Sequence, residues 1–242
     1  MTNSVPADAA SHRRIVDLSH VITDGMVTYP GIPGPVIGSH LTFDESASHY
    51  AAGTEFSIGT ISMAANTGTY LDTPAHRYRD GADLAGFDLE RMVDLEGVVA
   101  RARVRPGAGG RAIDESDLRR ALDGVDVAGA ELAGRAVLID TGHSDHWATP
   151  AYFAEHPYLT DDAVEFLLSR KPALVGIDSL NIDSTHTGRR PAHSWLLAAQ
   201  IPVVEHLTRL DELPDTGFRF TAAPPAVRGM GTFPVRAFAV LT

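Results

Sequence analysis

The sequence predicts a mixed α/β fold with a large sheet component and short helices. Segments with strand character outnumber helical ones along the chain. Residues 136–140 (AVLID) and 173–177 (ALVGI) are continuous apolar runs, typical of strands buried on both faces. Helix signals are short and begin at capping residues. At 242 residues the chain suits one domain, which we expect to span residues 14–242 behind a flexible tail, residues 1–13.

Further strands are expected where apolar residues alternate with small or polar ones, or form short β-branched runs. These segments are residues 15–19, 56–63, 97–104, 203–205, 218–222 and 235–241. Asp114 caps one predicted helix, Thr160 caps a second that Pro172 stops, and a third helical stretch lies near residues 194–199. Residues 25–38, rich in Gly and Pro, predict an irregular loop of the kind that shapes pockets.

Composition excludes several classes of function. The formal net charge of −11 argues against sequence-independent binding to nucleic acid or to an anionic membrane. The chain has no cysteine, which rules out disulfides, thiolate nucleophiles and cysteine-ligated zinc. The first residues show no apolar leader and no segment is apolar enough to span a bilayer, so we expect a cytoplasmic protein whose partner is a small-molecule substrate.

The segment 66–76 (NTGTYLDTPAH) has the richest chemistry. Asp72 and His76 are four residues apart, but Pro74 between them rules out a regular helix, so a rigid loop would have to bring them together. Taken alone, the pair is more often structural. His193 and Glu205 strengthen the signal, because a carboxylate at a strand end needs a partner if it is buried. A His, an Asp and a Glu from separate segments are ligands that suit zinc or manganese.

These residues carry a resemblance to a known family. The segment 66–76 resembles the signature His-x-Gly-Thr-His-x-Asp-x-Pro-x-His of the cyclase family, which includes kynurenine formamidases, isatin hydrolases and other metal-dependent amidohydrolases. The likeness extends almost end to end, through residues 17–31, 140–152, 176–205 and 231–240. It implies a swivelling β/β/α domain that assembles as a homodimer or homotetramer.

The resemblance also implies a metal site, half of which is altered. In the formamidase-like members one metal is held by the first two signature histidines and the Asp, and these histidine positions are Asn66 and Tyr70 in this chain. Asn is a weak ligand, and Tyr would first have to lose a proton with an ordinary pKa of about 10. The second site keeps Asp72, His193 and Glu205, which implies one divalent metal.

The other roles implied by the resemblance are in catalysis and substrate binding. His76 would pass a proton to the leaving nitrogen, and Tyr70 would donate a hydrogen bond to the developing oxyanion. Trp147 lies in a stretch that is near the substrate pocket in the family, and Tyr29 lies in an N-terminal loop that would contribute to a pocket shared between subunits. Arg190 is suited to hold a substrate carboxylate, although a solvated turn is the more common explanation for such a residue.

We therefore expect an arylformamidase-like amidohydrolase acting on the C–N bond of a small amide, formamide or cyclic amide. Asn66 would line the substrate site in this reading. The alternative is a homologue without metal that binds a small molecule, or that performs acid/base chemistry with His76 and Asp72 alone. A measurement of the metal content of the purified protein would distinguish the metal-dependent hydrolase from the homologue without metal.

Overall fold

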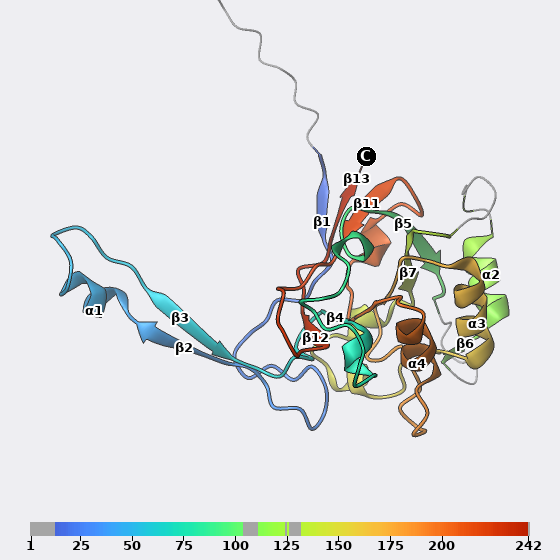
Figure 1. Cartoon of the computed structure of the whole chain (residues 1–242), viewed down its shortest axis with the longest axis horizontal. Helices are drawn as coiled ribbons and strands as arrows, with labels where there is room; N and C mark the ends of the chain where they lie inside the picture. The colour runs from blue at the N-terminus through green and yellow to red at the C-terminus, as the bar shows by residue number, and fades with distance from the viewer. Residues whose placement is uncertain (1–12, 104–110, 124, 126–131, 242) are drawn as a thin grey trace, which may run out of the picture.

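A mixed nine-stranded sheet forms the body of the molecule (Figure 1), in the order β1-β13-β11-β5-β7-β9-β10-β4-β12. The computed structural model describes residues 13–103, 111–123, 125 and 132–241. Four parallel strands occupy the middle of the sheet: β5 (Leu95–Arg101), β7 (Ala136–Asp140), β9 (Leu174–Ile177) and β10 (Val203–Glu205). Their carboxyl ends lie at one edge of the sheet, which is where open α/β sheets place their ligand sites.

Antiparallel strands flank the parallel centre on both sides. Beyond β5 lie β11 (Phe218–Thr221), β13 (Phe238–Leu241) and β1 (Ile15–Asp17). Beyond β10 lie β4 (Tyr70–Asp72) and β12 (Thr232–Pro234). The fold class predicted from the sequence, a mixed sheet with short helices, is confirmed.

The helices cover one face of the sheet. They are α2 (Glu115–Leu122), α3 (Asp161–Arg170) and α4 (Pro191–Ala198), and Figure 1 shows them together beside β5 and β7. Val137 and Ile139 of β7 belong to the core cluster that includes these helices, whereas Ala136 and Leu138 belong to the cluster on the opposite face. This alternation follows from the twofold repeat of a strand.

A long arm leaves this body. It consists of the hairpin β2 (Val36–Leu41) and β3 (Ile58–Ser62), with helix α1 (Phe43–Ala47) near its tip. The two strands pair only with each other among the described strands. A second small sheet joins β6 (Ala112–Ile113) to β8 (Tyr158–Leu159). The described 3-10 helices are η1 (Pro74–His76), η2 (Leu89–Arg91), η3 (His143–His146), η4 (Pro150–Phe153) and η5 (Leu210–Glu212).

Several predicted elements match closely. Strands β1, β3, β7, β9, β10, β11 and β13 lie within predicted segments, and β7 and β10 have the predicted bounds, whereas β5 begins two residues before its predicted segment. Asp114 caps α2 in a complete capping box with Asp117. Thr160 precedes α3 as predicted, although its side chain makes no capping bond.

Other predictions are wrong or lie outside the described residues. Residues 70–72 are a buried strand, not part of a loop, and β2, β6, β8, β12 and α1 were not predicted. Helix α4 begins at Pro191, three residues before the predicted stretch, because proline is favoured in the first turn of a helix. Residues 1–12 of the predicted tail and residue 104 of a predicted strand are outside the described residues. No described helix is both long and apolar enough to cross a bilayer.

Candidate metal centre

The pairing of β4 with β10 and β12 builds the centre. Tyr70 lies opposite Glu205 on β10, and Asp72 lies opposite Thr232 on β12. Tyr70 and Asp72 are two residues apart and therefore point to the same face of the sheet. The sequence separates Asp72 from Glu205 by more than half of the chain, but sheet register brings both carboxylates to one place. Both are buried, with 0% and 1% exposure.

His193 enters from the first turn of α4 and is held by Asp183. Its Nδ1 lies 2.6 Å from Asp183 Oδ2, which also accepts the backbone N–H of His193 at 3.1 Å. Asp183 Oδ1 accepts the backbone N–H of Ala192 at 2.7 Å. A carboxylate on one imidazole nitrogen fixes the ring and leaves the other nitrogen for a metal, the usual outer contact of metal-ligating histidines.

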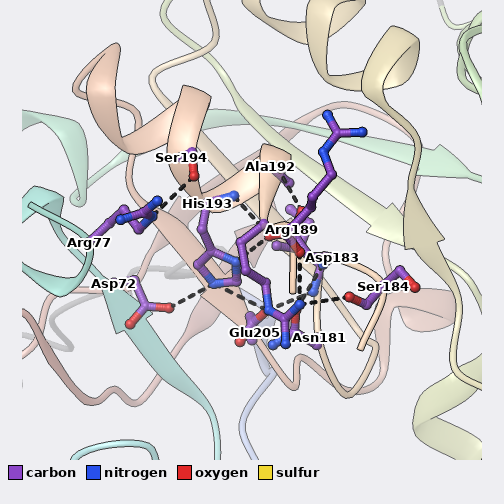
Figure 2. Close-up of polar contacts among 12 residues, drawn as sticks. Asp72, Arg77, Asn181, Asp183, Ser184, Arg189, Ala192, His193, Ser194 and Glu205 are labelled. Atoms are coloured by element: carbon purple, nitrogen blue, oxygen red, sulfur yellow. Dashed lines mark hydrogen bonds and ion pairs between the residues drawn. The ribbon is translucent and has the colours of Figure 1, made fainter. Parts of the chain in front are cut away.

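The free nitrogen of His193 faces two carboxylates. Figure 2 shows the imidazole between Asp72 and Glu205. Its Nε2 lies 3.5 Å from Asp72 Oδ2 and 3.6 Å from Glu205 Oε1. Zinc–ligand bonds of 2.0–2.2 Å in a tetrahedron require ligand atoms about 3.4 Å apart. Asp72 Oδ2 is buried and has no hydrogen-bond partner. His193 Nε2 therefore lies from each carboxylate at a separation that suits two ligands of one divalent cation.

His76 lies on the other oxygen of Asp72. Its Nδ1 is 3.3 Å from Asp72 Oδ1 and 2.7 Å from the hydroxyl oxygen of Thr232, and that hydroxyl donates its single proton to Asp72 Oδ1. In the neutral ring the proton must therefore be on Nδ1, which leaves Nε2 as the free base. The His76 side chain is 32% exposed, in contrast to the buried His193.

An alternative ligand set exists. One donor atom from each of Asp72, His76 and His193 lies within 4.8 Å of the others. Glu205 is not part of this group, although its Oε1 lies 3.6 Å from Nε2 of His193, and Nδ1 of His76 already contacts Thr232. Asp72 and His193 thus belong to both candidate ligand sets, with either His76 or Glu205 as the third member.

The two residues at the altered signature positions bond to each other and to Glu205. The Tyr70 hydroxyl donates to Glu205 Oε2 at 2.6 Å, and Asn66 forms a side-chain hydrogen bond to Tyr70. The backbone N–H of Ile182 donates to Glu205 Oε1 at 2.6 Å. These bonds place neutral donors at the two positions where the family signature has histidines. Each carboxylate oxygen has two lone pairs, so Oε1 of Glu205 can bind a cation while it accepts the N–H of Ile182.

The electrostatics of the cluster favour an added positive charge. Burial raises the pKa of Glu205 to about 7, and the nearby Asp72 adds to this shift. Burial acts to lower the pKa of His193, but Glu205, Asp183 and Asp72 together raise it well above its ordinary value. Burial, assisted by Glu205 and Asp72, likewise raises the pKa of the Tyr70 phenol, so that it keeps its proton. Without a cation, the cluster holds protons that a divalent ion would displace.

An aromatic cluster adjoins Tyr70. The ring of His206, the residue after Glu205, lies 5.1 Å from Tyr70 and 5.7 Å from Trp147, and its Nδ1 is 2.7 Å from the hydroxyl of Tyr152. His206 is fully buried, and its Nε2 has no hydrogen-bond partner. The sequence alone gave no reason to single out His206.

Three predicted substrate-binding residues lie outside the metal cluster. Trp147 belongs to the aromatic cluster. Tyr29 lies in the loop of residues 25–38, where its carbonyl accepts the N–H of Ile32 at 3.1 Å. Arg190 donates to the carbonyls of residues 184, 187 and 189, so its guanidinium closes its own loop. These bonds match the alternative explanation of Arg190, in which it belongs to a turn and does not hold a substrate carboxylate.

Sequence reasoning missed Asp183 and Thr232, which orient the cluster. A partner for the metal-facing histidine could be anticipated on chemical grounds. However, nothing local marks Asp183 among the 31 acidic residues of the chain. Thr232 follows Gly231, where a side chain would place its Cβ 2.1 Å from the backbone nitrogen of His76, so this glycine permits the close approach of β12 to η1.

Comparisons with known proteins agree with this architecture. The kynurenine formamidase of Bacillus cereus is 26% identical over 226 residues, covering 92% of this chain and 95% of that protein. Isatin hydrolase A from Labrenzia aggregata superposes with a TM-score of 0.79 at 23% identity, covering 95% of this chain and 94% of that one. A structure described as a potential metal-dependent hydrolase with cyclase activity superposes with a TM-score of 0.72 at 23% identity, covering 95% and 98% of the two chains.

The family itself follows from a match along most of the chain. Residues 16–184 match the family model described as "Putative cyclase", more than half of the 242 residues. This stretch contains the altered signature, from Asn66 to His76, and Asp183. The chain therefore belongs to the cyclase family.

Proposed function

We propose that this chain hydrolyses the C–N bond of a small amide, formamide or cyclic amide, using one divalent cation. The observation that carries the proposal is the buried, unpartnered Oδ2 of Asp72, 3.5 Å from a histidine nitrogen whose ring is fixed by Asp183. The name of the kynurenine formamidase relative supports the bond class, because a formamidase cleaves a C–N bond.

Asp72, His193 and Glu205 would hold the cation. Two carboxylates and one neutral imidazole balance its two charges, and this mixture of oxygen and nitrogen ligands suits zinc or manganese. When bound, such a cation lowers the pKa of the attacking water and polarises the carbonyl. Hydrolysis joins the water oxygen to the carbonyl carbon, breaks the C–N bond, and delivers a proton to the leaving nitrogen.

His76 is the residue placed to move that proton. Its Nδ1 is anchored to Thr232, and its side chain is partly exposed. A base held in one orientation can take a proton from water and return it to the leaving nitrogen. Tyr70 is differently placed, because its hydroxyl is 2.6 Å from Glu205 Oε2. Its main role in this proposal is to hold Glu205, and donation to an oxyanion would require that bond to open.

Metal content and turnover test the proposal together. Protein purified without chelator should contain about one zinc or manganese per chain, and should hydrolyse N-formyl aromatic amines or cyclic amides when that metal is supplied. His193→Ala should lose both metal and turnover. His186→Ala removes an exposed histidine from the neighbouring loop and serves as the matched control. Metal-independent turnover would favour the acid/base alternative, and absence of both metal and turnover would favour the small-molecule binding alternative.

Two further variants separate ligand from proton carrier. If Glu205 is a ligand and His76 is not, Glu205→Gln should lower metal affinity, whereas His76→Ala should retain metal and lose turnover. Titration calorimetry and turnover assays on the same preparations measure both properties. Loss of metal in His76→Ala with retention in Glu205→Gln would transfer the ligand role to His76.

We also propose that the protein assembles as a homodimer or homotetramer through its arm. A lone two-stranded hairpin is marginally stable in water, and this one exposes apolar side chains along its length. Ile37 and Ile61, paired across the two strands, are 48% and 50% exposed. A second copy is the partner that would cover this surface in every molecule.

Light scattering of a purified double variant tests the assembly. Ile37→Thr with Ile61→Thr keeps β-branched residues while removing apolar surface, and should shift the protein toward monomer. Leu89→Thr removes a 59% exposed leucine outside the arm and should leave the oligomer intact. A wild-type protein that is monomeric at all concentrations would overturn this assignment. The cytoplasmic location predicted from the sequence stays a prediction, which cell fractionation checks.

A further inference from the structure

A concavity on the helical face of the sheet contains none of the residues of the metal centre. It has a volume of about 520 Å³ and is formed by side chains of α2, of α3 and of residues that follow α2. Figure 1 shows these two helices side by side. The lining combines three arginines, Arg119, Arg120 and Arg170, with apolar side chains that include Leu132 and Phe166. The volume is in the range of small-molecule sites. We call this concavity the Arg170 pocket.

Two guanidinium groups lie over one aromatic ring in the Arg170 pocket. The Cζ atom of Arg119 is 4.6 Å from the centroid of the Phe166 ring, and the Cζ atom of Arg170 is 5.1 Å from it. Phe166 is only 7% exposed, so its ring is a fixed support for both cations. A guanidinium over an aromatic ring keeps the N–H groups at its edge, where they can bind a carboxylate, and its other face can stack on a second ring.

The three arginines differ in their acidic partners. Arg119 forms an ion pair with Glu115 at 2.6 Å, and Arg120 forms one with Asp117 at 2.8 Å, both within α2. Arg170, the half-buried last residue of α3, forms no ion pair within the described part of the chain. A cation that has lost part of its hydration without gaining an opposite charge is costly, which favours an anion beside Arg170.

The rest of the lining favours an apolar body on that anion. Leu122, Val125 and Leu132 contribute aliphatic surface. Asp123 is the one acidic residue of the described lining, against three arginines, in a chain whose net charge is −11. A small hydrated anion such as phosphate would leave the aliphatic surface in water. A flat aromatic ring would cover this surface and stack on a guanidinium.

We propose that the Arg170 pocket binds a small aromatic carboxylate, with Arg170 binding the carboxylate and the apolar side chains contacting the ring. The proposal does not depend on the proposed hydrolase function, because no residue of the metal centre takes part. A basic residue in the last turn of a helix also stabilises that helix. Ligand affinity, and not the stability of variants, is therefore the measurement that tests the role of Arg170.

Isothermal titration calorimetry with 2-naphthoate provides the test. The full-length protein is titrated in the presence of chelator, so that the carboxylate cannot bind a cation at the metal centre. We expect a Kd of about 1 mM or tighter, the range for a ligand of this size. 2-Naphthalenemethanol has the same ring without the charge, and hexanoate has the carboxylate without the ring. Each should bind at least about tenfold more weakly.

Two substitutions remove the same charge from the same pocket. Arg170→Met removes the arginine without an ion pair and should weaken 2-naphthoate at least about tenfold. Arg120→Met, the matched control, removes an arginine already paired with Asp117 and should weaken it less than about threefold. Arg170→Lys keeps the charge without the planar fork of donors and should weaken it about three- to tenfold. Circular dichroism confirms that each variant is folded.

Several outcomes would overturn the proposal. Equal losses in Arg170→Met and Arg120→Met would show an effect of overall charge, and unchanged affinity in Arg170→Met would place the ligand elsewhere. No binding by the wild type, or equal affinities for 2-naphthoate and 2-naphthalenemethanol, would have the same consequence. Asp72→Asn removes a candidate metal ligand and should leave 2-naphthoate binding unchanged. Loss of binding in that variant would assign the ligand to the metal centre and not to the Arg170 pocket.

Discussion

Replacing Asp183 by Asn tests the idea that the histidine ligand is oriented by a buried carboxylate. Three donors converge on this side chain: the backbone N–H of Ala192 on one oxygen, and the backbone N–H and Nδ1 of His193 on the other. The Asn amide has one acceptor oxygen and one NH₂ group. In Asp183→Asn, the donors that bond to one of the two carboxylate oxygens would therefore meet an NH₂ group, which cannot accept their hydrogen bonds. The shape of the side chain hardly changes.

The expected magnitudes follow from these contacts. A buried donor left without a partner costs about 1–3 kcal/mol, so the free energy of unfolding measured in chelator should fall by that amount. Loss of the outer contact on a metal-ligating histidine typically lowers metal affinity by about 10- to 100-fold. That loss corresponds to about 1.4–2.8 kcal/mol of binding free energy.

Asp178→Asn is the matched control. Asp178 is 1% exposed and accepts three hydrogen bonds, from the backbone N–H and hydroxyl of Thr141 and from the N–H of Gly142, but none from His193. Urea unfolding should show a similar loss of stability in both variants. Chelator competition should show weakened metal binding only in Asp183→Asn. Wild-type metal affinity in Asp183→Asn, or an equal loss in Asp178→Asn, would refute the orienting role.

Three other substitutions test separate parts of the structure. Tyr70→Phe should lower metal affinity about tenfold in chelator competition, because Glu205 loses a charge-assisted hydrogen bond that fixes it; unchanged affinity would contradict this. The pKa of His143 is lowered to about 4 by burial, against 6.5 when unfolded, so unfolding takes up protons between these values and stability falls as pH drops. The free energy of unfolding, measured by urea titration, should fall between pH 7 and pH 5 by up to about 2 kcal/mol less in His143→Gln than in the wild type. An equal fall in both proteins would exclude His143 as a cause of the pH dependence. Gly231→Ala should destabilise by about 3 kcal/mol because its Cβ meets backbone of η1, whereas Gly188→Ala, with open space around it, should be neutral in thermal unfolding.

The sequence predicted the central sheet well where strands are buried on both faces. Residues 136–140 form a continuous apolar run, and β7 has those bounds. Strand β4 was missed because its short segment is surrounded by Asn, Thr and Gly, which signal turns. Its strand conformation comes from pairing with β10 and β12, which are distant in sequence. Local patterns do not contain that information.

The same distinction applies to the site. Asp72, His76, His193 and Glu205 could be selected from the sequence because residue type and family resemblance both mark them, and the structure brings the four together. Residues that act through these four carry no such mark. Asp183, Thr232 and His206 became visible only through the contacts that register and helix placement create.

The altered signature is best understood as a change in how one carboxylate is stabilised. Glu205 is 1% exposed, and a buried carboxylate needs hydrogen bonds or positive charge. Tyr70 meets half of that need on Oε2, with Asn66 bonded behind it, so a second cation at that position would have to break both contacts. Among the described residues no donor forms a hydrogen bond to Oδ2 of Asp72, and the nitrogen of His193 lies 3.5 Å from it. Under the proposed function, a single cation would supply the positive charge that Asp72 Oδ2 lacks, whereas Glu205 Oε2 is already bonded by Tyr70.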